Sequence, residues 1–385
     1  MSEKGAAPQM KLSPLLIAAL LLCTAALACA QDLQPAAQRA RATLSSVIGG
    51  QATGMGGAFV AVANDGTALY WNPAALAGRR NTRVYGAIGG QSDNIDTLDE
   101  LLDVADILEE EDGLTVQEFN TIRDVARRND GSVIEGDVGA IGTVEINNFA
   151  IGYWAIAGGN AVLDYEQMDA LQEIPQVTES VDWDGDAVGQ AGAGVAYGRS
   201  ISTRWDLGIT ARLSALSVAA ADGRATATTI PEPAVGLANA YDVDTETTYT
   251  VDIGAMYRAG SHSQFGIVGR NLTSPSFDLM LERPSGVVEM QYEIEPSFDL
   301  GYSWMGDDGG VFAVDVHNVT EANDVGCEIA VGVSTPLADW LDARFGYGND
   351  QPTFGLGLNF GSVNVDIASA LNWEDRVAIS GASTF

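Results

Sequence analysis

The sequence predicts an all-β fold, a transmembrane antiparallel β-barrel of about 14 strands. Three observations support this: a secretion-type N-terminus, a period-two alternation of apolar and polar residues, and an aromatic last residue, Phe385. Residues 376–385 alternate up to the chain end, so the chain ends inside a predicted strand. This ending is typical of barrels in the outer membrane of Gram-negative-type bacteria, and we expect Phe385 to be the signal for the barrel-assembly machinery.

Residues 1–30 have the pattern of a secretory signal peptide, with lysines before a short apolar run and small residues before Gln31. That run is too short to span a bilayer as a stop-transfer helix. Met10 is an alternative start that gives a more typical signal, and Cys29 leaves lipidation open. We therefore expect a mature chain that begins near Gln31.

Composition excludes several classes of protein. The formal net charge is -33, and both lysines precede the predicted cleavage site. Nucleic acid is a poor partner for such a chain, because phosphate binding needs a basic patch. Cleavage leaves one cysteine, Cys327, which can form neither an internal disulfide nor a cysteine metal cluster.

The strand pattern begins near Val84. In residues 353–361 the apolar residues Phe354, Leu356 and Leu358 alternate with glycine, and similar alternation recurs to the chain end. A soluble sandwich would bury the apolar face, whereas a membrane barrel turns it toward lipid and encloses a polar lumen. The signal peptide and Phe385 favour the barrel.

The links between predicted strands alternate between long and short, as in outer-membrane barrels with short periplasmic turns. Two of the predicted long links span about residues 163–187 and 219–246. Residues 81–385 therefore form the predicted barrel, with both of its ends on the periplasmic side. Leucines at helical spacing predict a small helical insertion at about 97–128, within the first long link. Acidic residues in two long links argue against an external fatty-acid groove.

Residues 31–80 precede the barrel and contain the most specific motif. Gly54, Gly56 and Gly57 are spaced G-x-G-G, and Asp65 and an Asn-Pro-Ala triplet follow. Such glycines favour a tight turn close to other backbone. A nucleotide loop is a poor alternative, because the strand–loop–helix context and the G-x-G-x-x-G spacing are both missing.

This block resembles the N-terminal hatch of the FadL/TodX family of outer-membrane transporters, whose relatives include PorV and the TraF-like (conjugal transfer) barrels. The matching residues are Gly54, Gly56, Gly57, Ala58, Ala61, Ala63, Asp65, Asn72, Pro73 and Ala74. The resemblance implies a barrel of about 14 strands plugged by residues 31–80. In that arrangement we expect Asn72 to bond backbone groups and Pro73 to fix a turn.

No residue pattern indicates an enzyme, a cofactor or a metal site. His262 and His317 lack triad or metal partners, and no serine lies in a G-x-S-x-G elbow. We expect the lumen carboxylates to pair with arginines across strands. The carboxylates are Asp252, Asp299, Asp315, Asp342 and Asp366, and the arginines are Arg212, Arg258, Arg270 and Arg344. The expected lipid-interface aromatics are Tyr153, Trp154, Tyr197, Tyr257, Tyr302, Trp304 and Tyr347.

Two functional hypotheses follow. The first is passive uptake of small hydrophobic molecules by a FadL-like barrel in outer-membrane lipid. The alternative is a PorV- or TraF-like component of a secretion or conjugation system, with a binding or assembly role toward other proteins of that system. A purely structural barrel is the third possibility.

Overall fold

The computed structural model describes residues 49–92, 116–128, 133–168, 178–228, 235–240, 244–283, 286–324, 326–348, 350–370 and 376–385. The predicted signal peptide and the lead-in up to residue 48 lie outside these residues. So does the first part of the predicted helical insertion. Its second part is helix α6 (Val116–Arg128).

Fourteen antiparallel strands form a closed ring, which confirms the predicted barrel. The ring closes because β1 pairs with both β2 and β17, and because β4 pairs with both β3 and β5. Its strands are β1 (Thr82–Ser92), β2 (Val133–Ile146), β3 (Phe149–Met168), β4 (Thr178–Ser200), β5 (Trp205–Thr228), β7 (Asp244–Arg258), β8 (Ser263–Arg270), β11 (Ser297–Met305), β12 (Val311–His317), β13 (Glu328–Ala338), β14 (Leu341–Gly348), β15 (Gln351–Phe360), β16 (Val363–Ala370) and β17 (Arg376–Thr384).

Three strands lie outside the ring. Strand β6 (Val235–Ala240) extends the sheet beside the far part of β5. Strands β9 (Ser276–Arg283) and β10 (Gly286–Glu293) form a separate hairpin between β8 and β11, where the sequence predicts only a link. Within the described residues, no helix is long and apolar enough to cross a membrane.

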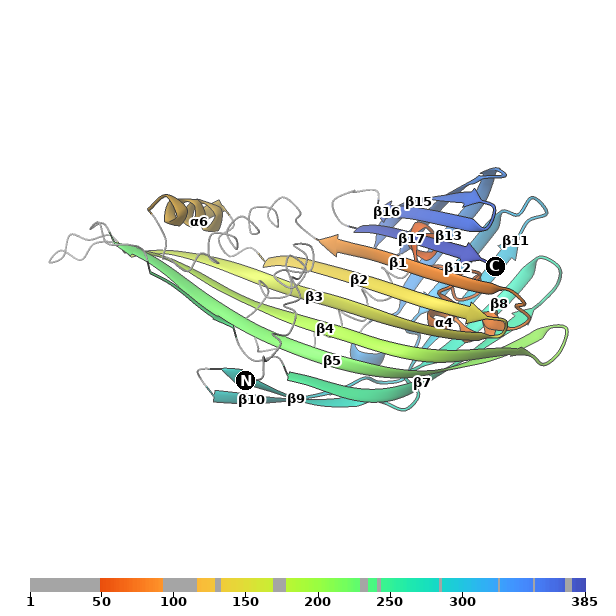
Figure 1. The fold of residues 1–385 in the computed structure, drawn as a ribbon, viewed down its shortest axis with the longest axis horizontal. Coiled ribbons are helices and arrows are strands. Elements are labelled where there is room, and N and C mark those ends of the chain that lie inside the picture. Colours follow the sequence, from red (N-terminus) through yellow and green to blue (C-terminus); the bar gives the residue numbers. More distant parts are fainter. Residues whose placement is uncertain are drawn as a thin grey trace, which may run out of the picture.

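The two ends of the barrel differ (Figure 1). At one end the strands are joined by short turns, such as residues 147–148 and 201–204, and the C-terminus also lies there. We call this the short-turn end. At the other end β3, β4 and β5 run far beyond the remaining strands, with 20, 23 and 24 residues. The predicted links 163–187 and 219–246 are therefore partly wrong, because the β3–β4–β5 ladders continue through many of these residues.

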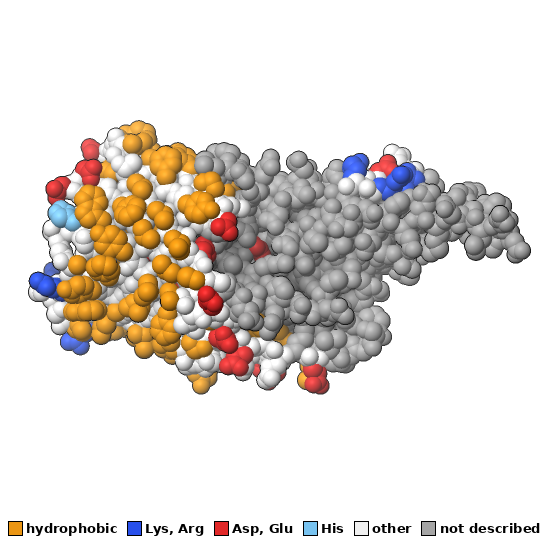
Figure 2. Space-filling view, turned by 180° about the vertical axis from the view of Figure 1, so that it is seen from behind, with side chains coloured by type: hydrophobic (Ala, Val, Ile, Leu, Met, Phe, Trp, Pro, Cys, Tyr) orange, Lys and Arg blue, Asp and Glu red, His pale blue; other side chains and the backbone are white. Residues whose placement is uncertain are grey.

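The outer and inner faces of the barrel are chemically inverted relative to a soluble protein. Large apolar side chains such as Ile151, Ile253 and Phe345 are exposed, and they form an apolar surface around the short-turn half (Figure 2). Polar residues that alternate with them in the strands, such as Asp252 and Arg344, are buried. This is the pattern of a lipid-facing exterior and a polar interior.

The core lies inside the barrel. It consists of residues 49–80, which we call the inner segment, together with inward side chains of the wall. The inner segment contains three short helices, α3 (Gly50–Gly54), α4 (Ala68–Trp71) and the 3₁₀ turn η1 (Pro73–Leu76). Most of its side chains are buried, including Phe59, Leu69 and Trp71.

Candidate functional site

The inner segment lies directly against a row of wall glycines. A Cβ atom at any of these positions would approach or overlap an atom of the inner segment. A glycine within a strand often marks such a close approach of another backbone. The row follows consecutive strands except for β12: Gly198 (β4), Gly208 (β5), Gly254 (β7), Gly266 (β8), Gly301 (β11), Gly332 (β13), Gly346 (β14) and Gly355 (β15). We call these residues the glycine row.

The G-x-G-G motif forms the turn after α3. Gly54 is the last residue of that helix, and a Cβ there would lie 3.1 Å from the Cα of Gly355. Gly56 and Gly57 have positive φ angles of 66° and 85°. A side chain at Gly56 would also lie 2.5 Å from the backbone nitrogen of Tyr347. The turn therefore requires glycine both for its backbone conformation and for its contact with the wall.

The Asn-Pro-Ala triplet holds two parts of the inner segment together. Asn72 Oδ1 accepts a hydrogen bond from the Ala74 amide at 3.1 Å and so caps η1, with Pro73 at the first helical position. Asn72 Nδ2 donates to the Val60 carbonyl at 2.9 Å and to the Ala255 carbonyl of β7 at 3.4 Å. Asn72 is fully buried. Without its side chain, the Ala74 amide and the carbonyls of Val60 and Ala255 would need other hydrogen-bond partners, because buried backbone groups are almost always paired.

Asp315 on β12 receives the first part of the inner segment. Its Oδ2 accepts hydrogen bonds from the amides of Phe59 at 2.5 Å and Val60 at 2.6 Å. The sequence predicts an arginine partner for this carboxylate, but the structure places two backbone donors there instead. Asp315 is completely buried, and its register partner on β11 is Gly301 of the glycine row.

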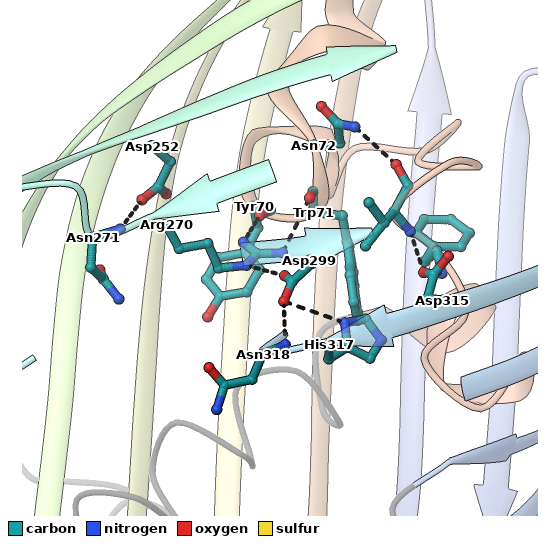
Figure 3. Close-up of polar contacts among 12 residues, drawn as sticks. Tyr70, Trp71, Asn72, Asp252, Arg270, Asn271, Asp299, Asp315, His317 and Asn318 are labelled. Atoms are coloured by element: carbon teal, nitrogen blue, oxygen red, sulfur yellow. Dashed lines mark hydrogen bonds and ion pairs between the residues drawn. The ribbon is translucent and has the colours of Figure 1, made fainter. Parts of the chain in front are cut away.

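An ion pair between β8 and β11 holds the middle of the inner segment (Figure 3). Arg270 Nε donates to Asp299 Oδ2 at 2.6 Å, as the predicted pairing requires. The guanidinium also donates to the carbonyls of Tyr70 at 2.5 Å and Trp71 at 3.2 Å. His317 lies on the same inner surface, 3.8 Å from Asp299 and 3.2 Å from the Gly57 carbonyl. One polar cluster therefore contacts the inner segment at two separate places.

A second cluster lies beside the first. Arg212 on β5 donates to Asp252 on β7 at 2.7 Å, and its guanidinium lies over the rings of Tyr70 and Trp154 at 5.8 and 5.7 Å. The prediction that Trp154 faces lipid is wrong, because the residue is only 1% exposed. It points inward, since the strand pattern places residues 150, 152, 154 and 156 of β3 on the lumen face. There the indole provides a surface for a buried cation.

Two further ion pairs lie near the start and the end of the inner segment. Arg344 donates to Asp366 at 2.6 Å, and Ser380 nearby accepts a bond from the Gly50 amide at 3.1 Å. At the other end Arg79 of the inner segment pairs with buried Glu145 of β2 at 2.5 Å. Glu145 lies on β2 and Asp366 on β16, and only β1 and β17 separate these strands in the ring. The two ion pairs therefore lie on the same side of the lumen.

Of the remaining predicted pairings, Asp342 lies 3.8 Å from Arg344, whereas Arg258 pairs with Asp206 rather than with a predicted carboxylate.

Asp65 stabilises the turn before α4. One of its carboxylate oxygens accepts hydrogen bonds from the amide, at 2.8 Å, and the hydroxyl of Thr67. Burial raises the pKa of the Asp65 carboxyl above its ordinary value, and the bonds from Thr67 act in the opposite direction. Asp65 of the motif therefore stabilises the fold of the inner segment by bonds within that segment.

Phe385 lies at the seam where the barrel closes. Its amide donates to the Thr82 carbonyl at 2.8 Å, which extends the pairing of β17 with β1. Its side chain is 78% exposed. The role of this residue as an assembly signal stays a prediction.

The sequence interpretation found the residues of the inner segment but missed their partners in the wall. The available signal was glycine at lumen positions of otherwise regular strands, because glycine weakens a strand unless another backbone needs the space. Asp315 offered no comparable signal, since its spacing matches that of the ion-paired carboxylates. Within the described residues, no group of three or more His, Cys, Asp or Glu could hold a metal ion.

Several solved structures are similar to this chain. The crystal structure of the Pseudomonas putida toluene transporter TodX is 11% identical, with a TM-score of 0.49 over 88% of this chain and 99% of that one. A Pseudomonas aeruginosa FadL homologue is 12% identical, with a TM-score of 0.47 over 85% and 95%. The monoaromatic hydrocarbon channel CymD is 12% identical, with a TM-score of 0.46 over 88% and 98%. No curated protein sequence matches the chain.

A family model supplies the assignment. The model described as "F plasmid transfer operon, TraF, protein" matches residues 69–316, from α4 of the inner segment through most of β12. This match confirms the TraF-like branch of the predicted resemblance. Because it covers well over half of the chain, the protein belongs to the TraF family of the F plasmid transfer operon.

Proposed function

We propose that the protein is an outer-membrane barrel that passes small hydrophobic molecules when its inner segment moves. The observation that carries this proposal is the position of residues 49–80, which pack within the ring against a row of glycines. The resemblance of residues 54–77 to the hatch of FadL/TodX transporters supports the same function. The inner segment is then the hatch that separates the two openings of the barrel.

The inner wall also supports an apolar cargo. Ile141 of β2 and Ile156 of β3 are buried on the lumen side, in the same core cluster as the inner segment. Leu216 of β5 is also buried on the lumen side, with Gln190 of β4 between it and Ile156. Such a surface stabilises apolar molecules by removing them from water, whereas it offers little to ions.

The test is uptake of a small apolar panel, for example toluene and related aromatic hydrocarbons, by a deletion strain and by its complemented parent. We expect slower uptake in the deletion strain, and faster uptake in a strain whose hatch is displaced by Gly346→Leu. Unchanged uptake across the whole panel in both strains would refute the proposal.

The family match favours a second candidate function, a role in a conjugation system as a binding or assembly component. This function requires a closed barrel that other proteins recognise. The buried hydrogen bonds between the inner segment and the wall support it, because they keep the barrel closed. A deletion donor strain would then transfer plasmid DNA at reduced frequency while its hydrocarbon uptake stays normal. The reverse result would favour uptake.

A further inference from the structure

At the short-turn end, the exposed basic side chains lie on one side of the barrel rim and the exposed acidic side chains lie on the other. On the side of β1, β4 and β5, three exposed arginines occur at Arg80, Arg199 and Arg204. We call these three residues the basic half-rim. Gly198 at the end of β4 packs against Ala77, so the chain that leads to Arg80 runs beside the strand end that carries Arg199.

The carboxylates near the basic half-rim are already neutralised. Glu145 is buried and paired with Arg79, and Asp206 is buried and paired with Arg258. No ion pair is formed by Arg80, Arg199 or Arg204 with any described residue. The basic half-rim therefore keeps three positive charges in a protein whose formal net charge is -33.

The opposite side of the same end is acidic. Asp307 and Asp308 are exposed in the turn between β11 and β12, and Asp339 is exposed in the turn between β13 and β14. His262 lies 3.8 Å from Asp307, where the two halves meet. Figure 2 shows the same separation at this end, with basic and acidic side chains in different places beside the apolar surface.

Aromatic side chains border the basic half-rim on its lipid side. Phe149 and Tyr197 form a ring pair at 4.6 Å, and Trp205 and Tyr257 form another at 4.7 Å. Such aromatic residues lie at the headgroup level of a membrane. Ile201, in the turn between Arg199 of β4 and Arg204, is 59% exposed. The three guanidinium groups thus lie where lipid phosphates are available.

We propose that the basic half-rim binds the phosphate groups of anionic phospholipids in the leaflet at the short-turn end, while the acidic half excludes them. A guanidinium group binds phosphate through two parallel hydrogen bonds, and its aliphatic stem packs along the apolar surface. One such group near an anionic surface strengthens binding about fivefold. The barrel would therefore carry anionic lipid on one side only. This proposal depends on the membrane position of the barrel and not on what the barrel transports.

The test uses the full chain purified in a neutral detergent and titrated, in native mass spectrometry, with phosphatidylglycerol or with phosphatidylcholine of the same acyl chains. The half-rim variant is Arg80→Gln/Arg199→Gln/Arg204→Gln. The control is Arg123→Gln/Arg127→Gln/Arg128→Gln in α6, which removes the same charge far from the short-turn end. All forms should show the same shift between unboiled and boiled samples on a gel, because the replaced arginines lie outside the barrel core.

We expect the parent and the α6 control to prefer phosphatidylglycerol by at least about tenfold, and the half-rim variant to lose that preference. Added salt should weaken the preference of the parent. An equal preference in the half-rim variant would overturn the proposal, and so would an equal loss in the α6 control. Saturable binding of a polyglutamate peptide, without any lipid preference, would assign the half-rim to an acidic protein partner instead and would also overturn it.

Discussion

The inner segment meets the wall in two different ways on two sides of the lumen. Against β13 and β14, the turn at Met55 and Gly56 touches backbone at Gly332 and Gly346, and the fit depends on missing side chains. Against β8, β11 and β12, the glycine row continues at Gly266 and Gly301, and the inner segment is also held by hydrogen bonds to Arg270 and Asp315. The first side is a steric contact that tolerates no added atom, whereas the second side adds hydrogen bonds that can be removed one at a time.

The largest effect on conductance should come from a bulky side chain on the steric side, at Gly346. In Gly346→Leu the new Cβ would overlap the backbone at Met55 and Gly56, so the inner segment must leave its place. We expect a clear rise in single-channel conductance in planar bilayers, together with a stability loss of about 1–3 kcal/mol.

The matched control for this change is Gly86→Leu. Gly86 lies on the exposed face of β1, and a Cβ there meets nothing closer than 3.9 Å. The control should therefore conduct like the parent. Equal conductance of the parent and Gly346→Leu would mean that the turn at Gly56 does not close the lumen.

The largest effect on stability should come from the buried ion pair on the polar side. Arg270→Met leaves Asp299 buried without its partner and removes two bonds to the inner segment. We expect a loss of about 3–5 kcal/mol in the free energy of unfolding, measured by urea titration in lipid vesicles. Arg123→Met breaks a pair whose aspartate, Asp124, is 54% exposed, so its loss should stay below about 1 kcal/mol. Similar losses in both variants would contradict the proposed difference.

A comparable effect is expected at Asp315, because two backbone donors would lose their acceptor. Asp315→Ala leaves the amides of Phe59 and Val60 without a partner, at about 1–3 kcal/mol for each. Asp315→Asn keeps one acceptor oxygen in place, so it should recover part of this loss. Faster proteolysis of the inner segment in the alanine variant, but not in the asparagine variant, would confirm that the two bonds act locally.

The smallest effects are expected within the inner segment itself. Asn72→Ala removes the cap of η1 and the bond to Val60, which should lower stability by about 1–2 kcal/mol. Asn72→Asp keeps the capping oxygen but loses the donor, so it separates the two contributions. A loss above that of Arg270→Met would show that the internal bonds of the inner segment, rather than its bonds to the wall, hold it in place.

The sequence alone determined the class of fold and the chemistry of its two faces. A period of two assigns each residue of a strand to one face, so the exposed positions of residues such as Phe345 and the buried positions of residues such as Arg344 follow directly. It also located the motif of the inner segment, since glycines and an Asn-Pro pair restrict the backbone wherever they occur.

Only the tertiary structure decided which residues meet across the lumen. Asp315 bonds the amides of Phe59 and Val60 more than 250 residues away, and Trp154 turns toward Arg212 instead of lipid. Periodicity carries no information about such partners, because they depend on the closure of the ring and on the path of the inner segment within it. The same reason explains the unexpected length of β3, β4 and β5: pairing with neighbouring strands maintains them where local composition predicts a loop.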